Sequence, residues 1–159
     1  MPSANQVEIR LAAAEDAPVV ASVLYESFAE FKALYTDSGF AATALGAQQV
    51  LARMHEGPVW VAVRQGVVVG TVAAIVKDES VYVRGMAVLP TARGLKAGAR
   101  LLRQVEGWAT SQSCNRLFLS TTPFLHSAIH LYERSGFRRI NRDLHDLFGT
   151  PLFTMEKVL

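Results

Sequence analysis

The sequence predicts one α/β (α+β) domain in which helices cover the faces of a mixed β-sheet. Three observations support this. The 159 residues have the length of an ordinary single domain, so we expect residues 1–159 to form one. Hydrophobic residues make up 50% and charged residues 19%, a balance that disordered chains lack. The apolar spacing reads β-α-α-β-β-β-α-β-α-β-β, with consecutive strands in the middle and strand–helix alternation later.

The N-terminal half begins with one strand and two helices. "VEIRLA" alternates from Val7 and predicts a strand. Asp16 can cap the helix that follows, and Pro18 is tolerated in its first turn. Its apolar stripe contains Val20, Val23, Leu24, Ser27, Phe28 and Phe31. "TDSGF" (residues 36–40) is expected to break the helical pattern, and a second stripe (Ala47, Val50, Leu51 and Met54) ends at Gly57-Pro58.

The middle and the C-terminal half contain the remaining elements. Residues 59–76 form two β-rich runs joined at Gln65-Gly66, which predicts a hairpin. "SVYVRGMAVL" (80–89) is a third strand, in which Gly85 indicates a bulge or a close backbone approach. A helix follows from Gly98, then a buried strand (115–121) and a short helix that ends at Gly136. The segments 137–144 and 151–159 are the last strands.

The turn from Arg93 to Gly98 carries more glycines and cations than a simple connection needs. Helix N-termini present unpaired N–H groups and partial positive charge, and glycine lets a ligand approach the backbone. A phosphate would fit there, with Arg93 as a bidentate donor. Solvated cations on an ordinary turn explain the same residues equally well. The spacing matches neither a P-loop nor a dinucleotide fingerprint.

Composition excludes several classes of function. The 16 basic and 14 acidic residues give a net charge of +2, too even a balance for nucleic-acid binding. The single cysteine, Cys114, excludes an internal disulfide, and no base in the sequence near it marks it as a nucleophile. His126 and His130 lie one helical turn apart without an evident third ligand, so we expect no metal. Lacking a long apolar stretch, the chain is expected to be cytoplasmic with no membrane partner.

Two segments, one downstream of the other, resemble the GNAT (Gcn5-related N-acetyltransferase) superfamily. "MAVLP" (86–90) leads into the turn at Arg93, where the family has a [QR]-x-x-G-x-[GA] motif that binds the pyrophosphate of acetyl-CoA. "AIHLYERSGF" (128–137) matches the family's A-x-x-x-Y-x-x-x-G-F helix, which lies beside the thioester. The resemblance spans the whole element order and is strongest from Tyr82 to Phe137.

The resemblance implies a mostly antiparallel central sheet of about 6–7 strands with about 4 helices. It implies an acetyl-CoA-dependent N-acetyltransferase that acts on a primary amine of a small molecule by direct attack. A catalytic acid, Tyr132, would protonate the departing thiolate. The implied cofactor-binding residues are Met86, Ala87 and Val88 along the pantetheine arm, and Arg93, Gly94, Leu95, Lys96, Ala97, Gly98 and Ala99 around the pyrophosphate.

Two positions depart from the family pattern. Lys96 stands where the family usually has glycine, and Leu125 stands where many members have asparagine. If Lys96 needed a positive φ, the side chain would cost on the order of 1 kcal/mol. We instead expect Lys96 to be helical already, because Leu95 and Ala97 beside it suit a helix start.

Several roles stay open at this stage. A core position for Tyr132 is the competing interpretation. Glu79 and Glu30 are candidate bases, although each is also an ordinary solvated carboxylate. Phe28, Phe31, Tyr35 and Phe40 are expected to divide between the core and an acceptor pocket. A non-catalytic acyl-CoA sensor and an acetyltransferase of protein N-termini are the alternatives, and an exposed edge expected at the C-terminal strand favours a homodimer.

Overall fold

The structure, a computed structural model, describes residues 6–159, except for the side chains of residues 141–144. Its described part contains seven strands in one sheet: β1 (Glu8–Leu11), β2 (Val59–Arg64), β3 (Val67–Lys77), β4 (Ser80–Val88), β5 (Arg116–Thr121), β6 (Arg138–Leu147) and β7 (Thr150–Val158). The helices are α1 (Ala17–Phe28), α2 (Asp37–Thr43), α3 (Ala47–Met54), α4 (Ala97–Ser111) and α5 (His126–Arg134). Short 3₁₀ helices are η1 (Ala14–Asp16), η2 (Ala29–Leu34) and η3 (Pro90–Ala92).

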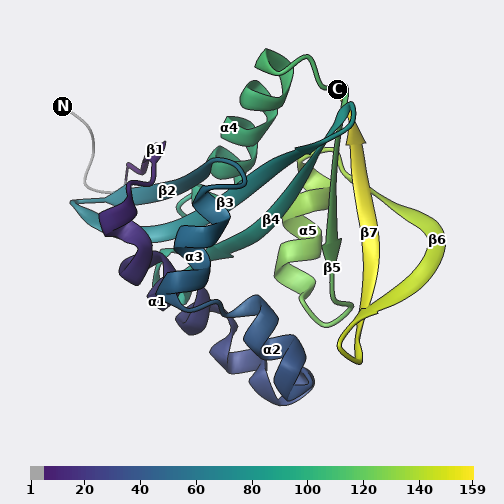
Figure 1. Cartoon of the computed structure of the whole chain (residues 1–159), viewed down its shortest axis with the longest axis horizontal. Helices are drawn as coiled ribbons and strands as arrows, with labels where there is room; N and C mark the ends of the chain where they lie inside the picture. Colours follow the sequence, from purple (N-terminus) through teal and green to yellow (C-terminus); the bar gives the residue numbers. More distant parts are fainter. Residues whose placement is uncertain (1–5) are drawn as a thin grey trace.

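The sheet has the order β1-β2-β3-β4-β5-β7-β6, and every pairing is antiparallel except that of β4 with β5 (Figure 1). This confirms the predicted mixed, mostly antiparallel sheet. The β2–β3 hairpin turns at Gln65-Gly66, where both residues have positive φ, as a two-residue turn of this kind requires. The C-terminal strand β7 lies between β5 and β6, so the expectation of an exposed edge at that strand is wrong; β6 is the edge.

Helices cover both faces of the sheet. The α4 and α5 side of the sheet packs around Leu101, Leu102, Val105 and other buried residues that include Tyr132. On the opposite face α1 and α3 pack through Val20, Val23, Leu24 and Val50. Each fully buried leucine or valine contributes roughly 1.5–3 kcal/mol of hydrophobic free energy, so the two apolar stripes are enough to hold the helices on the sheet.

The segment after α1 differs from the prediction. The helix α1 ends at Phe28 and continues as η2, and "TDSGF" opens the helix α2 instead of breaking a pattern. Thr36 caps α2 by accepting a hydrogen bond from the N–H of Gly39 at 3.0 Å. The described residues therefore contain five α-helices, one more than the expected number of about four.

Asp16 also behaves differently from a simple helix cap. Its side chain makes no hydrogen bond to the first amides of α1. Instead, Oδ2 accepts from the N–H of Ala13 at 2.7 Å, and the carboxylate receives both terminal nitrogens of Arg10 at 2.8 and 3.1 Å. The carboxylate therefore fixes the chain that leads from β1 into α1, and this environment lowers its pKa, mainly through the hydrogen bonds from Arg10.

Candidate active site

The site begins where β4 and β5 separate. The two parallel strands pair only from Ser80 opposite Arg116 to Tyr82 opposite Phe118. The rings of Tyr82 and Phe118 stack at this last pair, with 5.1 Å between centroids. Beyond it the strands diverge (Figure 1), so the second half of β4 has β3 on one edge and no strand on the other.

A bulge lies in this second half of β4. Ala73 on β3 pairs with Arg84, whereas Thr71, two residues earlier, pairs with Ala87, three residues later. One extra residue is therefore inserted at Gly85–Met86, and Gly85 takes a φ of +61° that suits glycine. The sequence prediction of a bulge at Gly85 is confirmed.

The free edge of β4 presents backbone groups toward the cleft. The N–H of Leu89 donates to the carbonyl of Val69 on β3 at 2.8 Å. Because successive residues of a strand point their N–H and C=O groups to opposite edges, those of Val88 face away from β3, as do those of Met86 two residues earlier. These groups can bind an extended ligand that carries its own amides.

The turn between η3 and α4 contains two left-handed residues. Gly94 has a φ of +91° and Lys96 a φ of +62° with ψ of 17°. The expectation that Lys96 is already helical is therefore wrong: Lys96 is the N-cap, one residue before α4 begins. A left-handed residue is needed there because the chain must turn from the extended Arg93 into the helix within three residues.

The N-terminus of α4 can cradle an anion. The helical hydrogen-bond ladder starts with the N–H of Arg100 donating to Lys96, so the amides of Ala97, Gly98 and Ala99 have no acceptor within the helix. Gly98 is also close to α5: a Cβ there would lie 2.6 Å from Cδ2 of Leu131 and 3.3 Å from Cε of Met86. The glycine keeps the gap between α4 and α5 open, and the residues present fit a phosphate-bearing cofactor.

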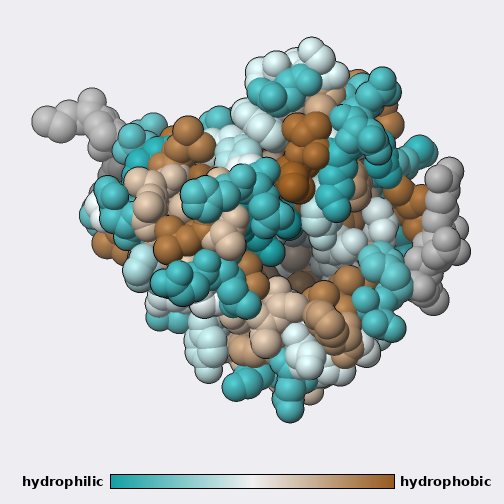
Figure 2. Space-filling view, in the orientation of Figure 1, coloured by the Kyte–Doolittle hydropathy of each residue, from teal (hydrophilic) through white to brown (hydrophobic). Residues whose placement is uncertain are grey.

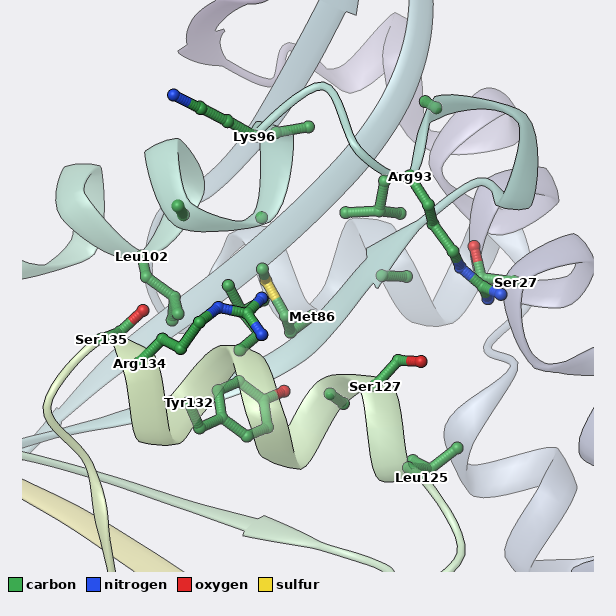
Figure 3. A pocket seen from close by; sticks show the side chains of 18 of the residues that line it. Ser27, Met86, Arg93, Lys96, Leu102, Leu125, Ser127, Tyr132, Arg134 and Ser135 are labelled. Atoms are coloured by element: carbon green, nitrogen blue, oxygen red, sulfur yellow. The ribbon is translucent and has the colours of Figure 1, made fainter.

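One cavity of about 910 Å³ joins these features (Figure 3). It is lined by all but one of the predicted site residues: Met86, Ala87, Val88, Arg93, Gly94, Lys96, Ala97, Gly98, Ala99 and Tyr132. The exception is Leu95, whose side chain packs against the core and whose N–H donates to Ala92 at 3.3 Å. The ammonium of Lys96 extends on the side of the turn away from α5 (Figure 3).

Arg93 is already paired. Its Nη1 lies 2.9 Å from Oε1 of Glu30 in η2, and both side chains are about half exposed. The guanidinium consequently points toward the end of α1 and away from the N-terminus of α4 (Figure 3). An anion at the turn would compete with Glu30 for Arg93.

Tyr132 lies on α5 and is 6% exposed. Its ring contacts Phe137, with centroids 5.9 Å apart, and the residue lines the cavity. Burial raises the pKa of Tyr132 well above its ordinary value, and Tyr35 adds to the effect. The phenol therefore stays protonated at neutral pH and can act as a hydrogen-bond donor inside the cavity. Tyr132 therefore packs in the hydrophobic core and also presents a hydrogen-bond donor to the cavity.

The other end of the cavity reaches the face covered by α1. Phe28 and Phe31 line it there, whereas Tyr35 and Phe40 are each 7% exposed and belong to the interior. Two of the four aromatic residues therefore line the cavity and two are interior, which confirms the expected division of their positions. Ser27 lies beside them with a buried hydroxyl that has no hydrogen-bond partner in the structure. Sequence reasoning missed Ser27, although it is the only polar member of the α1 stripe.

Neither candidate base is among the residues that line the cavity. Glu79 precedes β4 and lies six residues from Gly85, which is about 20 Å along an extended strand. Glu30 is held by Arg93. Among the residues whose side chains are described, no group of three His, Cys, Asp or Glu residues could hold a metal ion. Cys114 is buried before β5 and does not line the cavity.

The sequence and the fold of this chain are similar to those of known proteins. Residues 21–137 match the model of the Acetyltransferase (GNAT) family. The chain belongs to this family. Members of this family are acetyltransferases, and acetyl-CoA is the cofactor that the family uses.

Individual relatives are moderately similar. The chain is 31% identical over 134 residues to the uncharacterised N-acetyltransferase YjgM of Escherichia coli strain K12, covering 80% of this chain and 79% of that protein. It is 40% identical over 79 residues to an IAA acetyltransferase of Azospirillum brasilense; that match covers 48% of this chain and spans about half (52%) of the relative. The PaiA N-acetyltransferase of Thermoplasma acidophilum, solved in complex with coenzyme A, superposes with a TM-score of 0.83 at 18% identity, covering 97% and 99% of the two chains.

No helix within residues 6–159 is long and apolar enough to cross a lipid bilayer.

Proposed function

We propose that this protein transfers the acetyl group of acetyl-CoA to a primary amine of a small molecule by direct attack of the amine. The observation that carries the proposal is the single cavity that joins three parts. It runs from the amides at the start of α4, along the free edge of β4, to Tyr132 and the aromatic end at Phe28. An elongated anionic thioester needs an anion site, a hydrogen-bonding edge and a proton donor in that order.

In this proposal the turn residues hold the pyrophosphate. The unpaired amides of Ala97, Gly98 and Ala99 donate to phosphate oxygens, and Gly94 leaves open space beside them. Arg93 exchanges Glu30 for a phosphate, and Lys96 adds positive charge near the turn. Leu95 contributes through its place in the turn rather than through its own N–H, which is already bonded.

In this proposal the second half of β4 binds the pantetheine arm of acetyl-CoA. The N–H and C=O groups of Met86 and Val88 pair with its amides as a neighbouring strand would, and Ala87 supplies part of the wall. Because β5 does not pair with this half of β4, a ligand that hydrogen-bonds to these groups takes the place of the missing strand.

Acetyl-CoA, when bound, supplies an acetyl group activated as a thioester. The chain's own groups then act on the reaction. The N–H groups at the β4 bulge stabilise negative charge on the carbonyl oxygen. The Tyr132 hydroxyl donates its proton to the departing sulfur, which becomes a more basic acceptor in a buried cavity than in water. The phenolate then recovers a proton from the amine nitrogen, which became positively charged on attack, so that the products are the neutral amide and the thiol. The apolar surroundings of Phe28 and Phe31 favour the neutral, nucleophilic form of the acceptor amine.

Titration with acetyl-CoA in a calorimeter, followed by a thiol-release assay against a broad amine panel, tests the proposal. We expect binding at sub-millimolar concentration and thiol release that depends on the amine. Absence of binding would refute it. Binding without thiol release would favour an acyl-CoA sensor, and thiol release with peptides alone would favour an acetyltransferase of protein N-termini. Preference for ATP or NAD over coenzyme A would point to another nucleotide.

A further inference from the structure

Two arginines lie behind the β4 bulge, on the face of the sheet covered by α3. Arg53 comes from α3, and its Nη1 would lie 2.7 Å from a Cβ built on Gly85. Arg84 is the strand residue directly before Gly85, and the pairing of Ala73 with Arg84 marks the start of the bulge. The guanidinium of Arg53 therefore sits against the backbone at the point where β4 changes its register.

The two positive charges share one carboxylate. Arg84 Nη2 lies 3.3 Å from Oε2 of Glu56, whose side chain is 51% exposed. Nε and Nη2 of Arg84 are buried, and neither makes a hydrogen bond. Burial and the charge of Arg84 lower the pKa of Arg53 to about 10, a shift that Tyr82 and Glu56 oppose without cancelling. Buried cations are normally paired and hydrogen-bonded, so this cluster lacks one anion.

The cluster lies beside the acceptor end of the cavity without lining it: Ala87, which follows the bulge on the same face, lines the cavity, whereas Arg53 and Arg84 do not. That end reaches the α1 and α3 face through Ser27, Phe28 and Ala87. Figure 2 shows this face hollowed at its centre, in the region where β4 and β5 separate in Figure 1. The side chain of Arg84 is 18% exposed, but its Nη2 is buried against Glu56, so a ligand reaches that nitrogen by displacing Glu56. Gly85 is adjacent to Met86, and neighbouring Cα atoms are about 3.8 Å apart, so this point is close to the free edge of β4.

We propose that Arg84 binds a carboxylate of the acceptor, with Arg53 behind it supplying the second positive charge. This inference rests on the proposed acetyl transfer and specifies its substrate class: a small amine that carries a carboxylate a few bonds from the nitrogen, as an amino acid does. The ligand takes the place of Glu56 at Arg84. A peptide N-terminus whose first residue is not acidic has no carboxylate at that distance and does not fit the cluster.

Matched acceptors test the inference directly. In the thiol-release assay we expect amino acids to have a kcat/KM about 10- to 100-fold above that of their carboxamides, because a hydrogen-bonded charge contributes this much to binding. Arg84→Gln should remove that preference by raising the KM of the acid while the KM of acetyl-CoA stays the same. Glu56→Gln should act in the opposite direction and lower the KM of the acid. Arg138→Gln deletes a guanidinium that is 76% exposed and should change neither value.

A binding measurement keeps the inference separate from the proposed function. Free amino acids at millimolar concentration should raise the melting temperature of the wild type in the presence of coenzyme A, and should not do so for Arg84→Gln or Arg53→Gln. If no amine releases thiol but this stabilisation is seen, the carboxylate site stands and the proposed transfer fails. Equal turnover of acids and carboxamides, an intact preference in Arg84→Gln, or no stabilisation of the wild type would overturn the carboxylate site.

Discussion

Replacing Lys96 by glycine should stabilise the protein. Lys96 has a φ of +62°, a left-handed conformation that disfavours every side chain with a Cβ. At such a position glycine is more stable than a residue with a Cβ by about 1 kcal/mol, even after its greater freedom in the unfolded chain is counted. For a domain of this size that free energy raises the melting temperature by about 2–4 °C. Urea unfolding monitored by circular dichroism measures both quantities.

The sign of this change separates two conformations of the turn. If Lys96 were helical, glycine would lower the free energy of unfolding by about 0.7 kcal/mol, because lysine is the better helix former. Lys96→Ala is the matched control, since alanine removes the ammonium but keeps the left-handed strain. Stabilisation by alanine as large as that by glycine would refute the backbone explanation. For acetyl-CoA affinity the two variants should lose the same factor, about 5-fold or less, because both remove one exposed charge.

The remaining predictions concern the site and one ion pair. Tyr132→Phe should lower kcat by about 10²–10⁴-fold while calorimetry finds nearly unchanged acetyl-CoA affinity, whereas Tyr25→Phe, at a half-exposed tyrosine of α1, should change neither. Unchanged turnover would make Tyr132 a core residue only. Glu30→Gln should tighten acetyl-CoA binding by up to about 5-fold at low salt, because it frees Arg93; weaker binding would contradict the competition. Asp16→Asn should lower the free energy of unfolding by about 2 kcal/mol at pH 7. Since the folded-state pKa of Asp16 lies below the reference value of 3.8, its contribution is present above that pH and is lost as the pH falls through the folded pKa, so the two proteins should converge in acid melts.

Local patterns predicted the elements that local chemistry determines. Gln65-Gly66 between two β-rich runs predicts a tight hairpin because few residue pairs accept two positive φ angles. The bulge at Gly85 and the helix end at Gly136, with a φ of +98°, are predictable for the same reason. The residues of the turn and of α5 could be assigned to one site only through the family resemblance, because they lie on separate elements.

The missed features depend on contacts distant in the sequence. "TDSGF" looks like a turn in the sequence. In the structure, Thr36 forms hydrogen bonds with Thr150 and Phe148, more than 100 residues away in the sequence, and these contacts hold Thr36 in place as the N-cap of α2. Lys96 was expected to be helical because propensity alone favours that state, whereas the geometry of the strand-to-helix turn overrides it. Nothing in the spacing of Arg53 and Arg84 shows that both guanidiniums meet at one bulge, since α3 and β4 come together only in the folded sheet.

The bulge connects the two halves of the proposed chemistry. Without the extra residue, β4 would continue the regular ladder, and the side chains after Arg84 would point to the opposite faces of the sheet. With it, Met86 lines the cavity beside α4 and α5 while Ala87 contacts the α1 side. The separation of β4 from β5 then opens the sheet at this same point, so that a donor held on one face and an acceptor held on the other can meet through the gap. The Tyr82–Phe118 stack stands at the last paired position and fixes where the gap begins. A position for Arg84 just before the bulge therefore places its charge on the acceptor's face, where a Cβ on Gly85 would also meet Arg53.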